Sequence, residues 1–146
     1  MKLKQLLCIF GFVGVALCSC SDDDDDHAVV NDEAVKKTFA QMFPDTQVHE
    51  WEMEMGFYKA EFVKDGKSVE AWFKTDGTWM KTETDLSLSD LPTPAKEYLS
   101  EHYPTNHVDD VDWVETPSGN YFLVELDAKG ADIYLRFLAD GTLVTS

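Results

Sequence analysis

FYKAEFVKDGKSVEAWFKTDGTW, residues 57–79, consists of three short segments of alternating apolar and polar residues, separated by Asp65-Gly66 and Asp76-Gly77. Alternation with a period of two is typical of half-buried strands, and Asp-Gly is among the strongest signals for a hairpin turn. The stretch therefore predicts strands at 57–63, 68–74 and 79–83, and the residues upstream add a strand at 47–55. Together these segments predict an antiparallel sheet.

The same pattern returns later in the chain. Six features match features that lie 64 positions further on, namely Tyr58 with Phe122, Glu61 with Glu125, Gly66 with Gly130, Phe73 with Phe137, Asp76-Gly77 with Asp140-Gly141, and Trp79 with Leu143. We interpret the chain as two tandem copies of one unit, at about 31–88 and 89–146, in which the second copy repeats the strands of the first.

Each copy is predicted to begin with a helix that has one apolar face. In the first copy, Asn31 or Asp32 is the predicted N-cap and Pro44 ends the helix. Its apolar positions are Val35, Phe39, Met42 and Phe43. In the second copy, Thr93 is the predicted N-cap, Pro94 lies in the first turn and Pro104 ends the helix. Its apolar positions are Ala95, Leu99 and Tyr103. The fold class is therefore α+β, with two helix-plus-antiparallel-strand repeats and the helices packed on one face of the sheet.

The period of two divides the strand residues between two faces of the sheet. The apolar face expected beneath the helices holds Tyr58, Ala60, Phe62, Val69, Ala71, Phe73, Phe122, Val124, Leu126, Ile133, Leu135 and Phe137. The opposite face mixes aromatic and charged residues: Phe57, Lys59, Glu61, Glu70, Trp72, Lys74, Tyr121, Leu123, Glu125, Asp132, Tyr134 and Arg136. That face has two interpretations, because Trp, Tyr and Arg are common in binding hot spots and cross-strand aromatic pairs also stabilise sheets.

The N-terminus predicts export and a lipid anchor. Lys2 and Lys4 precede an uncharged run at 6–17, which is the pattern of a secretory signal peptide, here residues 1–19. Cys20 has a Leu three places before it and a Ser just before it, whereas Cys18 has neither, so Cys20 is the predicted lipidation site. We expect an outer-membrane lipoprotein of a Gram-negative bacterium.

An acidic segment follows the cysteine, at 20–30, and includes the five aspartates of 22–26. It resembles the surface-export signal of lipoproteins in some Gram-negative bacteria, which predicts surface exposure. The simpler interpretation is a solvated tether, because blocks of like charge repel one another and stay disordered.

Composition excludes several partners and chemistries. The chain holds 28 Asp and Glu against 12 Lys and Arg, for a net charge of −16, so neither nucleic acid nor an anionic membrane surface is an expected partner. The lipid anchor is therefore the expected contact with the membrane. All three cysteines fall within the first 20 residues, so the domain at 31–146 has no disulfides and no thiol chemistry.

No catalytic, cofactor or metal site is predicted. The chain lacks nucleophile-elbow, phosphate-loop and dinucleotide motifs, and its four histidines lack ligand spacing. Glu50, Glu52 and Glu54 alternate so that they could face one side of a strand, but a solvated strand face explains them. The aspartates 109, 110 and 112 and the aspartates of 22–26 lack the spaced loop of a strong calcium site, which leaves weak calcium binding open.

The pattern Tyr58-Lys59-Ala60-Glu61-Phe62, with Gly66, 69–73, 76–79 and Phe43-Pro44, resembles the beta-lactamase-inhibitor-like, PepSY-like family of exported bacterial proteins. The resemblance implies a curved antiparallel sheet with both helices on its convex side. In the beta-lactamase inhibitor itself, the concave face and a hairpin loop hold the enzyme. The positions here that correspond to those contacts are Asp65, Trp72 and Tyr134.

The resulting expectation is a non-catalytic protein- or peptide-binding module, inhibitor-like, on an envelope lipoprotein. The alternatives are a structural accessory lipoprotein of an envelope complex and, less favoured, an enzyme. The candidate partner-binding residues are Phe57, Asp65, Trp72, Tyr121, Tyr134 and Arg136.

Overall fold

The computed structural model describes residues 32–145, so the predicted signal peptide at 1–19, the lipidation site Cys20 and the acidic segment at 20–30 lie outside the described residues. The described part is an α+β fold, as predicted. Its elements are α1 (Glu33–Met42), β1 (Val48–Glu54), β2 (Phe57–Lys64), β3 (Lys67–Lys74), β4 (Trp79–Asp85), the 3-10 helix η1 (Leu88–Asp90), α2 (Thr93–His102), β5 (Val108–Thr116), β6 (Gly119–Leu126) and β7 (Ile133–Phe137). All seven of these strands form one antiparallel sheet in sequence order, β1 to β7.

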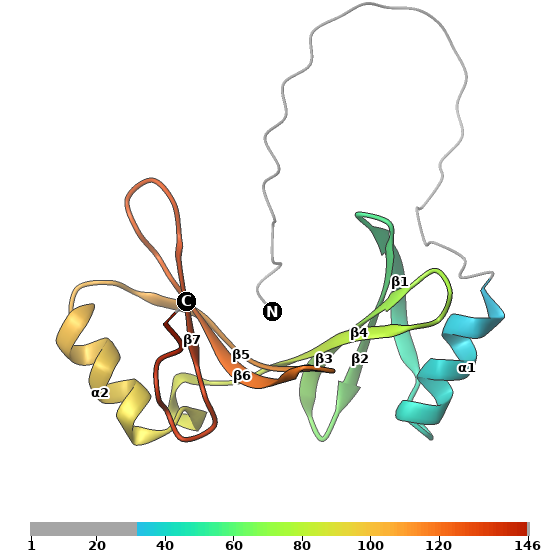
Figure 1. Cartoon of the computed structure of the whole chain (residues 1–146), viewed down its shortest axis with the longest axis horizontal. Coiled ribbons are helices and arrows are strands. Elements are labelled where there is room, and N and C mark those ends of the chain that lie inside the picture. The colour runs from blue at the N-terminus through green and yellow to red at the C-terminus, as the bar shows by residue number, and fades with distance from the viewer. Residues whose placement is uncertain (1–31, 146) are drawn as a thin grey trace, which may run out of the picture.

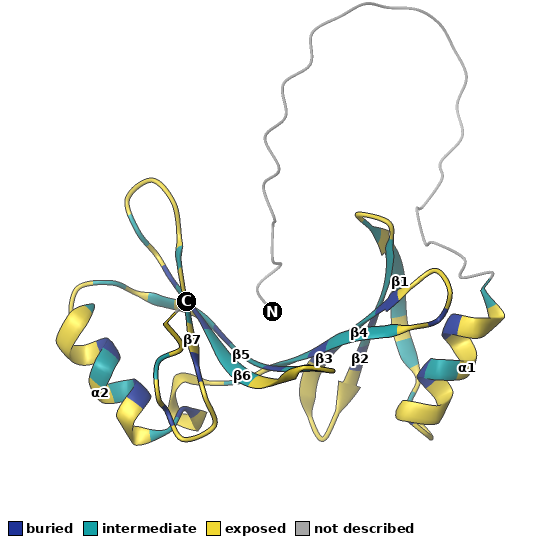
Figure 2. Ribbon diagram, viewed as in Figure 1, coloured by how far each residue is buried: buried dark blue, intermediate teal, exposed yellow. Residues whose placement is uncertain are grey.

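The sheet is strongly bent, and a helix lies at each outer end of it (Figure 1). α1 packs outside the strands of the first half, and α2 packs outside those of the second half (Figure 1). The buried residues of each helix are on the side that faces the strands (Figure 2). The inner side of the bend therefore carries no helix, and we call it the inner face.

The two helices begin and end close to the predicted positions, with two differences. Asp32 caps α1, because its Oδ1 accepts a hydrogen bond of 2.9 Å from the amide of Ala34. Met42 is 36% exposed, so its predicted place in the core is wrong. α1 ends at this residue, and Phe43, outside the helical conformation, turns into the core instead.

α2 starts one residue earlier than predicted. The N-cap is Pro92 and not Thr93, because the carbonyl of Pro92 already accepts the first helical hydrogen bond, from the amide of Lys96 at 3.2 Å. Pro94 lies in the first turn, as expected, where its missing N–H costs nothing. Ala95 and Leu99 are buried against the sheet.

Each helix covers its own hydrophobic core. The core under α1 consists of Val35, Phe39, Phe43, Ala60, Phe62, Val69, Ala71 and Phe73. The core under α2 consists of Leu91, Ala95, Leu99, Val111, Val124, Leu126 and Phe137. The facing predicted for the apolar strand residues is confirmed, since Tyr58, Phe122, Ile133 and Leu135 also pack against these cores while half-buried.

The two halves meet where β4 pairs with β5. This seam runs from the pair Thr82 and Glu115 to the pair Asp85 and Asp112. The prediction that the second copy repeats every strand is wrong at its end, where only an isolated bridge joins Phe137 to Leu143. β4 is held by β3 on one side and by β5 on the other, whereas the segment after β7 has β7 as its one neighbouring strand among the described residues. The tandem repeat itself stays an interpretation.

Two of the three Asp-Gly turns, Asp76-Gly77 and Asp140-Gly141, also position a helix. Gly77 has φ +85°, and a Cβ built on it would lie 2.8 Å from the carbonyl carbon of Ala34 in α1. Gly141 has φ +87°, and its Cβ would lie 3.0 Å from the amide nitrogen of Ala95 in α2. The glycines therefore permit the turn conformation and let the first turn of each helix approach the sheet.

Candidate interaction surface on the inner face

The inner face is defined by the cross-strand pairs that lie opposite the two cores. Trp72 on β3 pairs with Lys59 on β2 and with Lys81 on β4. Phe73, the next residue along β3, is fully buried in the first core. Because neighbouring residues of a strand point to opposite faces, Trp72 and its two lysine neighbours lie on the inner face, as predicted for Trp72.

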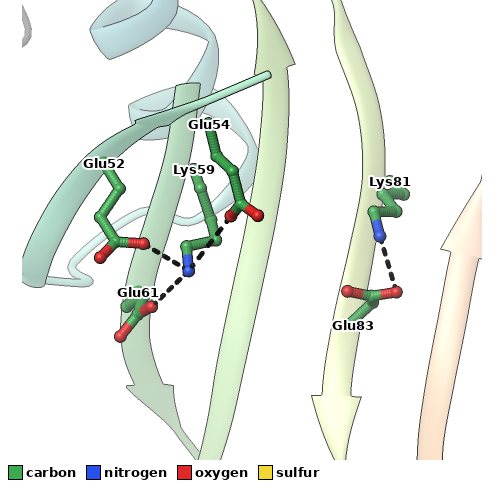
Figure 3. A network of polar contacts seen from close by, with 6 residues as sticks. All are labelled: Glu52, Glu54, Lys59, Glu61, Lys81 and Glu83. Atoms are coloured by element: carbon green, nitrogen blue, oxygen red, sulfur yellow. Dashed lines mark hydrogen bonds and ion pairs between the residues drawn. The ribbon is translucent and has the colours of Figure 1, made fainter. Parts of the chain in front are cut away.

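Lys59 is the centre of an ion cluster on this face. Its Nζ lies 2.8 Å from Oε1 of Glu61 and 3.8 Å from Oε2 of Glu54, and it also pairs with Glu52 (Figure 3). Burial by itself would lower the pKa of Lys59, but the hydrogen bonds to Glu52 and Glu61 and the nearby charge of Glu70 outweigh it and hold the pKa well above its ordinary value. Lys59 is therefore a fixed cation of the folded protein.

Trp72 is flanked by two cations. The Nζ of Lys81 lies 4.6 Å from the centre of its ring, and the Nζ of Lys59 lies 5.7 Å away. Both distances are within the range of cation–π attraction. The indole Nε1 is buried and has no hydrogen-bond partner among the described residues. The structure therefore shows Trp72 as a half-buried ring held between lysines.

Glutamates face one another across four strands of this face. Glu50 on β1 pairs with Glu61 on β2, Glu61 with Glu70 on β3, and Glu70 with Glu83 on β4. The Cβ atoms of directly opposed residues lie roughly 5 Å apart, and like charges at that distance repel each other. Lys81 offsets part of this charge through an ion pair of 2.8 Å with Glu83 (Figure 3). We call these four residues the glutamate row.

The second half contributes two aromatic contacts to the inner face. The guanidinium carbon of Arg136 on β7 lies 5.0 Å from the centre of the Tyr121 ring on β6. The hydroxyl of Tyr134 donates a hydrogen bond of 3.0 Å to Oε1 of Glu125. Tyr134 is 56% exposed, which makes it the most accessible aromatic ring among the candidate residues.

Burial and nearby acidic residues act on the pKa of Glu125. Burial raises the pKa of Glu125, and the charges of Asp132, Asp109 and Asp110 raise it further, against the lowering effect of the Tyr134 hydrogen bond. Burial also raises the pKa of Tyr134, together with its bond to Glu125 and the same negative charges. A cation placed here would therefore relieve a local excess of negative charge.

The structure brings some of the six candidate residues together and leaves others apart. Tyr121 and Arg136 are in contact, whereas Trp72 lies on β3, well away from Tyr134 on β7, with three strands between them. Asp65 has φ +53° and sits in the turn between β2 and β3. Trp72 lies at least about 15 Å along β3 from that turn. A partner that touches both the turn and Trp72 must therefore extend along the hairpin.

Phe57, the sixth candidate, lies at the start of β2. It pairs with Glu54 on β1 and with Lys74 on β3, and it is half-buried. Sequence reasoning missed Lys81 and Glu83. A bulge between Trp72 and Phe73 shifts the β3–β4 pairing, so the residues of β4 that face inward cannot be identified from alternation alone.

The acidic residues considered as enzyme or calcium ligands are placed differently. Glu52 and Glu54 lie on one side of β1, as alternation allows, and that side is the inner face, where both pair with Lys59. The aspartates 109 and 110 lie at a register irregularity of β5, where Asp110 pairs with Glu125. Asp109 instead joins His107 and Asp127, whose potential ligand atoms lie within 4.8 Å of one another on the exposed surface. The sequence did not reveal this group, because Asp127 lies in the connection between β6 and β7, far along the chain from His107 and Asp109.

No helix among the described residues is long and apolar enough to span a membrane. The α-helices α1 and α2 are short and amphipathic, and each has ten residues.

Comparison with known proteins gives a family and several similar structures. The family model described as "Putative beta-lactamase-inhibitor-like, PepSY-like" matches residues 56–145. A BLIP-like protein from Bacteroides fragilis is 29% identical, with a TM-score of 0.67 over 77% of this chain and 82% of that one. A DUF2874 family protein from Bacteroides ovatus is 28% identical, with a TM-score of 0.68 over 77% of this chain and 84% of that one.

A third structure shares the fold at lower identity. It comes from Bacteroides eggerthii and is described as one of the "putative periplasmic proteins". It is 20% identical, with a TM-score of 0.67 over 77% of this chain and 85% of that one. No curated protein matches the chain.

Proposed function

Because the chain belongs to the beta-lactamase-inhibitor-like, PepSY-like family, we propose that it is a non-catalytic binding module that holds a protein or peptide on the inner face of its sheet. The observation that carries the proposal is that this face has no helix over it (Figure 1) and yet displays charged side chains (Figure 3) together with the aromatic rings of Trp72, Tyr121 and Tyr134. Core packing explains the aromatics of the outer face, such as Phe73, but it does not explain the exposed ring of Tyr134. Aromatic and Arg side chains are typical of binding hot spots.

The proposed place of action is the bacterial envelope. The similar structure from Bacteroides eggerthii is described as putatively periplasmic, which agrees with the signal peptide read from residues 1–19. We propose that Cys20 carries a lipid, that the chain is an outer-membrane lipoprotein, and that the acidic segment at 20–30 displays the domain at the cell surface. The inhibitor-like family description suggests that the partner is a protein, and it leaves the partner's identity open.

Capture from the native envelope tests the proposal. Wild-type protein and the variants Trp72→Ala and Tyr134→Ala are used as bait, and retained proteins are quantified. Leu88→Ala is the control, because Leu88 is an exposed apolar residue of η1, 44% exposed and outside the strands that form the inner face. One retained protein that is lost with the inner-face variants and kept with the control supports the proposal. Equal retention by all four baits contradicts it and favours a structural accessory role.

A further inference from the structure

The inner face carries far more acidic than basic side chains. By strand register its acids are Glu50, Glu52, Glu54, Glu61, Glu70, Glu83, Asp85, Asp110, Asp112 and Glu125, and its bases are Lys59, Lys74, Lys81 and Arg136. The ten acids occupy six strands, β1 to β6, and the four bases are confined to β2, β3, β4 and β7. With ten acids against four bases, the face has a net negative charge whichever of these residues pair with one another.

Several of these acids are directly opposite one another. Besides the glutamate row, Asp85 pairs with Asp112 across the seam, and Asp110 pairs with Glu125. Like charges directly opposite one another on a sheet are unfavourable. Solubility alone does not require acids to be directly opposite one another, because scattered acids would serve it without this repulsion. A line of carboxylates does suit the binding of several cations.

We propose that the inner face binds a cationic segment of a polypeptide, rich in Lys or Arg and extended across the strands. This proposal rests on the proposed function and names the chemistry of its partner. A metal ion fits the arrangement poorly, because among the described residues the acids of this face do not bring three ligand atoms together, whereas His107, Asp109 and Asp127 do so elsewhere.

Apolar side chains lie between the acids. Tyr121 and Leu123, both half-buried on β6, pair with Val114 on β5 and with Arg136 on β7 respectively. The aliphatic stems of Lys and Arg pack on such residues while their charged ends reach nearby carboxylates. The surface therefore suits a basic polypeptide better than a small polyamine, which offers no side chains to pack there.

The charges of the protein also exclude two other occupants of this face. The aspartates of 22–26 have the same sign as the inner face and would be repelled by it. A second copy of the chain would bring a further net charge of −16. The occupant that complements the face is thus a basic partner, and its association should be accelerated by electrostatic steering at low salt.

Binding of a fluorescent oligolysine, followed by anisotropy, tests the proposal on the protein with its acidic N-terminal segment intact. An acetylated oligolysine of the same length is the uncharged probe. The double variant Glu70→Gln with Glu83→Gln removes two inner-face charges, and Glu97→Gln with Glu101→Gln removes two exposed charges from α2. At about fivefold per lost ion pair, the inner-face variant should weaken binding about tenfold or more, and the α2 variant less than about twofold.

Three results would overturn the proposal. The first is equal weakening by the two double variants, which would mean attraction by net charge alone. The second is equal binding of the acetylated probe. The third is complete loss of binding when 22–26 are changed to Ser, which would place the site in the N-terminal segment.

A measurement on the unaltered protein guards against misfolding of the variants. Amide chemical shifts should move on β3 to β6 when oligolysine is added, and those of α1 and α2 should not; shifts confined to the helices would contradict the proposal. If oligolysine fails in both measurements while envelope capture still depends on Trp72 and Tyr134, the cationic chemistry is wrong and the binding module stands.

Discussion

Replacing Phe73 by Ala tests which face of the sheet forms the core. Phe73 is fully buried on β3, and its ring centre lies 6.3 Å from that of Phe39 in α1 and 6.4 Å from that of Trp51 on β1. Trp72, its neighbour in sequence, lies on the inner face between Lys59 and Lys81. The two variants Phe73→Ala and Trp72→Ala therefore remove aromatic rings from opposite faces of one strand.

The expected cost follows from burial. A Phe side chain buries roughly 150 to 250 Å², which at about 25 cal/mol per Å² corresponds to about 4 to 6 kcal/mol. Residual burial in the unfolded chain lowers this by roughly 10 to 40%, so Phe73→Ala should cost about 3 to 5 kcal/mol of unfolding free energy. Trp72→Ala should cost about 1 to 2 kcal/mol, because the ring is half-buried and its lysine neighbours are flexible enough to fill the space.

Urea unfolding followed by far-UV circular dichroism measures both values without relying on tryptophan emission. With a denaturant slope of about 2 kcal/mol per M, the midpoint should fall by ~2 M for Phe73→Ala and by less than ~1 M for Trp72→Ala. Phe137→Ala is the matched variant in the second core, where Phe137 is fully buried under α2, and its midpoint should fall as far as that of Phe73→Ala. A Trp72→Ala midpoint as low as that of Phe73→Ala would refute the facing assignment and remove the proposed binding surface.

Three further predictions concern the anchor, the turns and the ion cluster. Cys20→Ala should abolish labelling with a radioactive fatty acid and release the protein in soluble form, while Cys18→Ala should not; labelling that survives Cys20→Ala would disprove the assignment. Gly77→Ala should cost at least about 1 kcal/mol more than Gly56→Ala in the same urea assay, because both glycines have φ +85° but only Gly77 lies against α1. Equal costs would show that the contact with Ala34 relaxes freely. Lys59→Met should lower stability at neutral pH by about 2 kcal/mol by leaving its glutamates without a cation. Since the folded pKa of Lys59 is raised, the difference from wild type should be constant from neutral pH up to about pH 10, the unfolded value, and shrink above it; a difference that already shrinks between pH 7 and pH 9 would contradict the cluster.

The sequence predicted the strands well because their signals are local. A period of two places Val69, Ala71 and Phe73 on one face whatever lies elsewhere in the chain, and the structure buries all three. Asp-Gly pairs likewise mark turns, because glycine accepts a positive φ without strain. The errors at Met42 and Thr93 occurred at helix ends, where one residue of difference changes the direction of a side chain.

The inner face itself could be predicted only in part. Strand alternation placed Trp72, Tyr121 and Arg136 on it, and the contact of Arg136 with the Tyr121 ring agrees with that placement. Alternation could not show which residues of β4 face inward, because the bulge between Trp72 and Phe73 shifts the register of the β3–β4 pairing.

By itself, the sequence determined the α+β class, the antiparallel strands and their turns, and the division of residues between two faces, since all of these follow from short-range periodicity and turn chemistry. Only the tertiary structure decided that Lys81 flanks Trp72, that four glutamates meet in one row, and that Gly77 lies against α1. The physical reason is that these contacts join residues on different elements. Their distances are set by strand register, by the bulge between β3 and β4, and by helix docking, which no local pattern in the chain specifies.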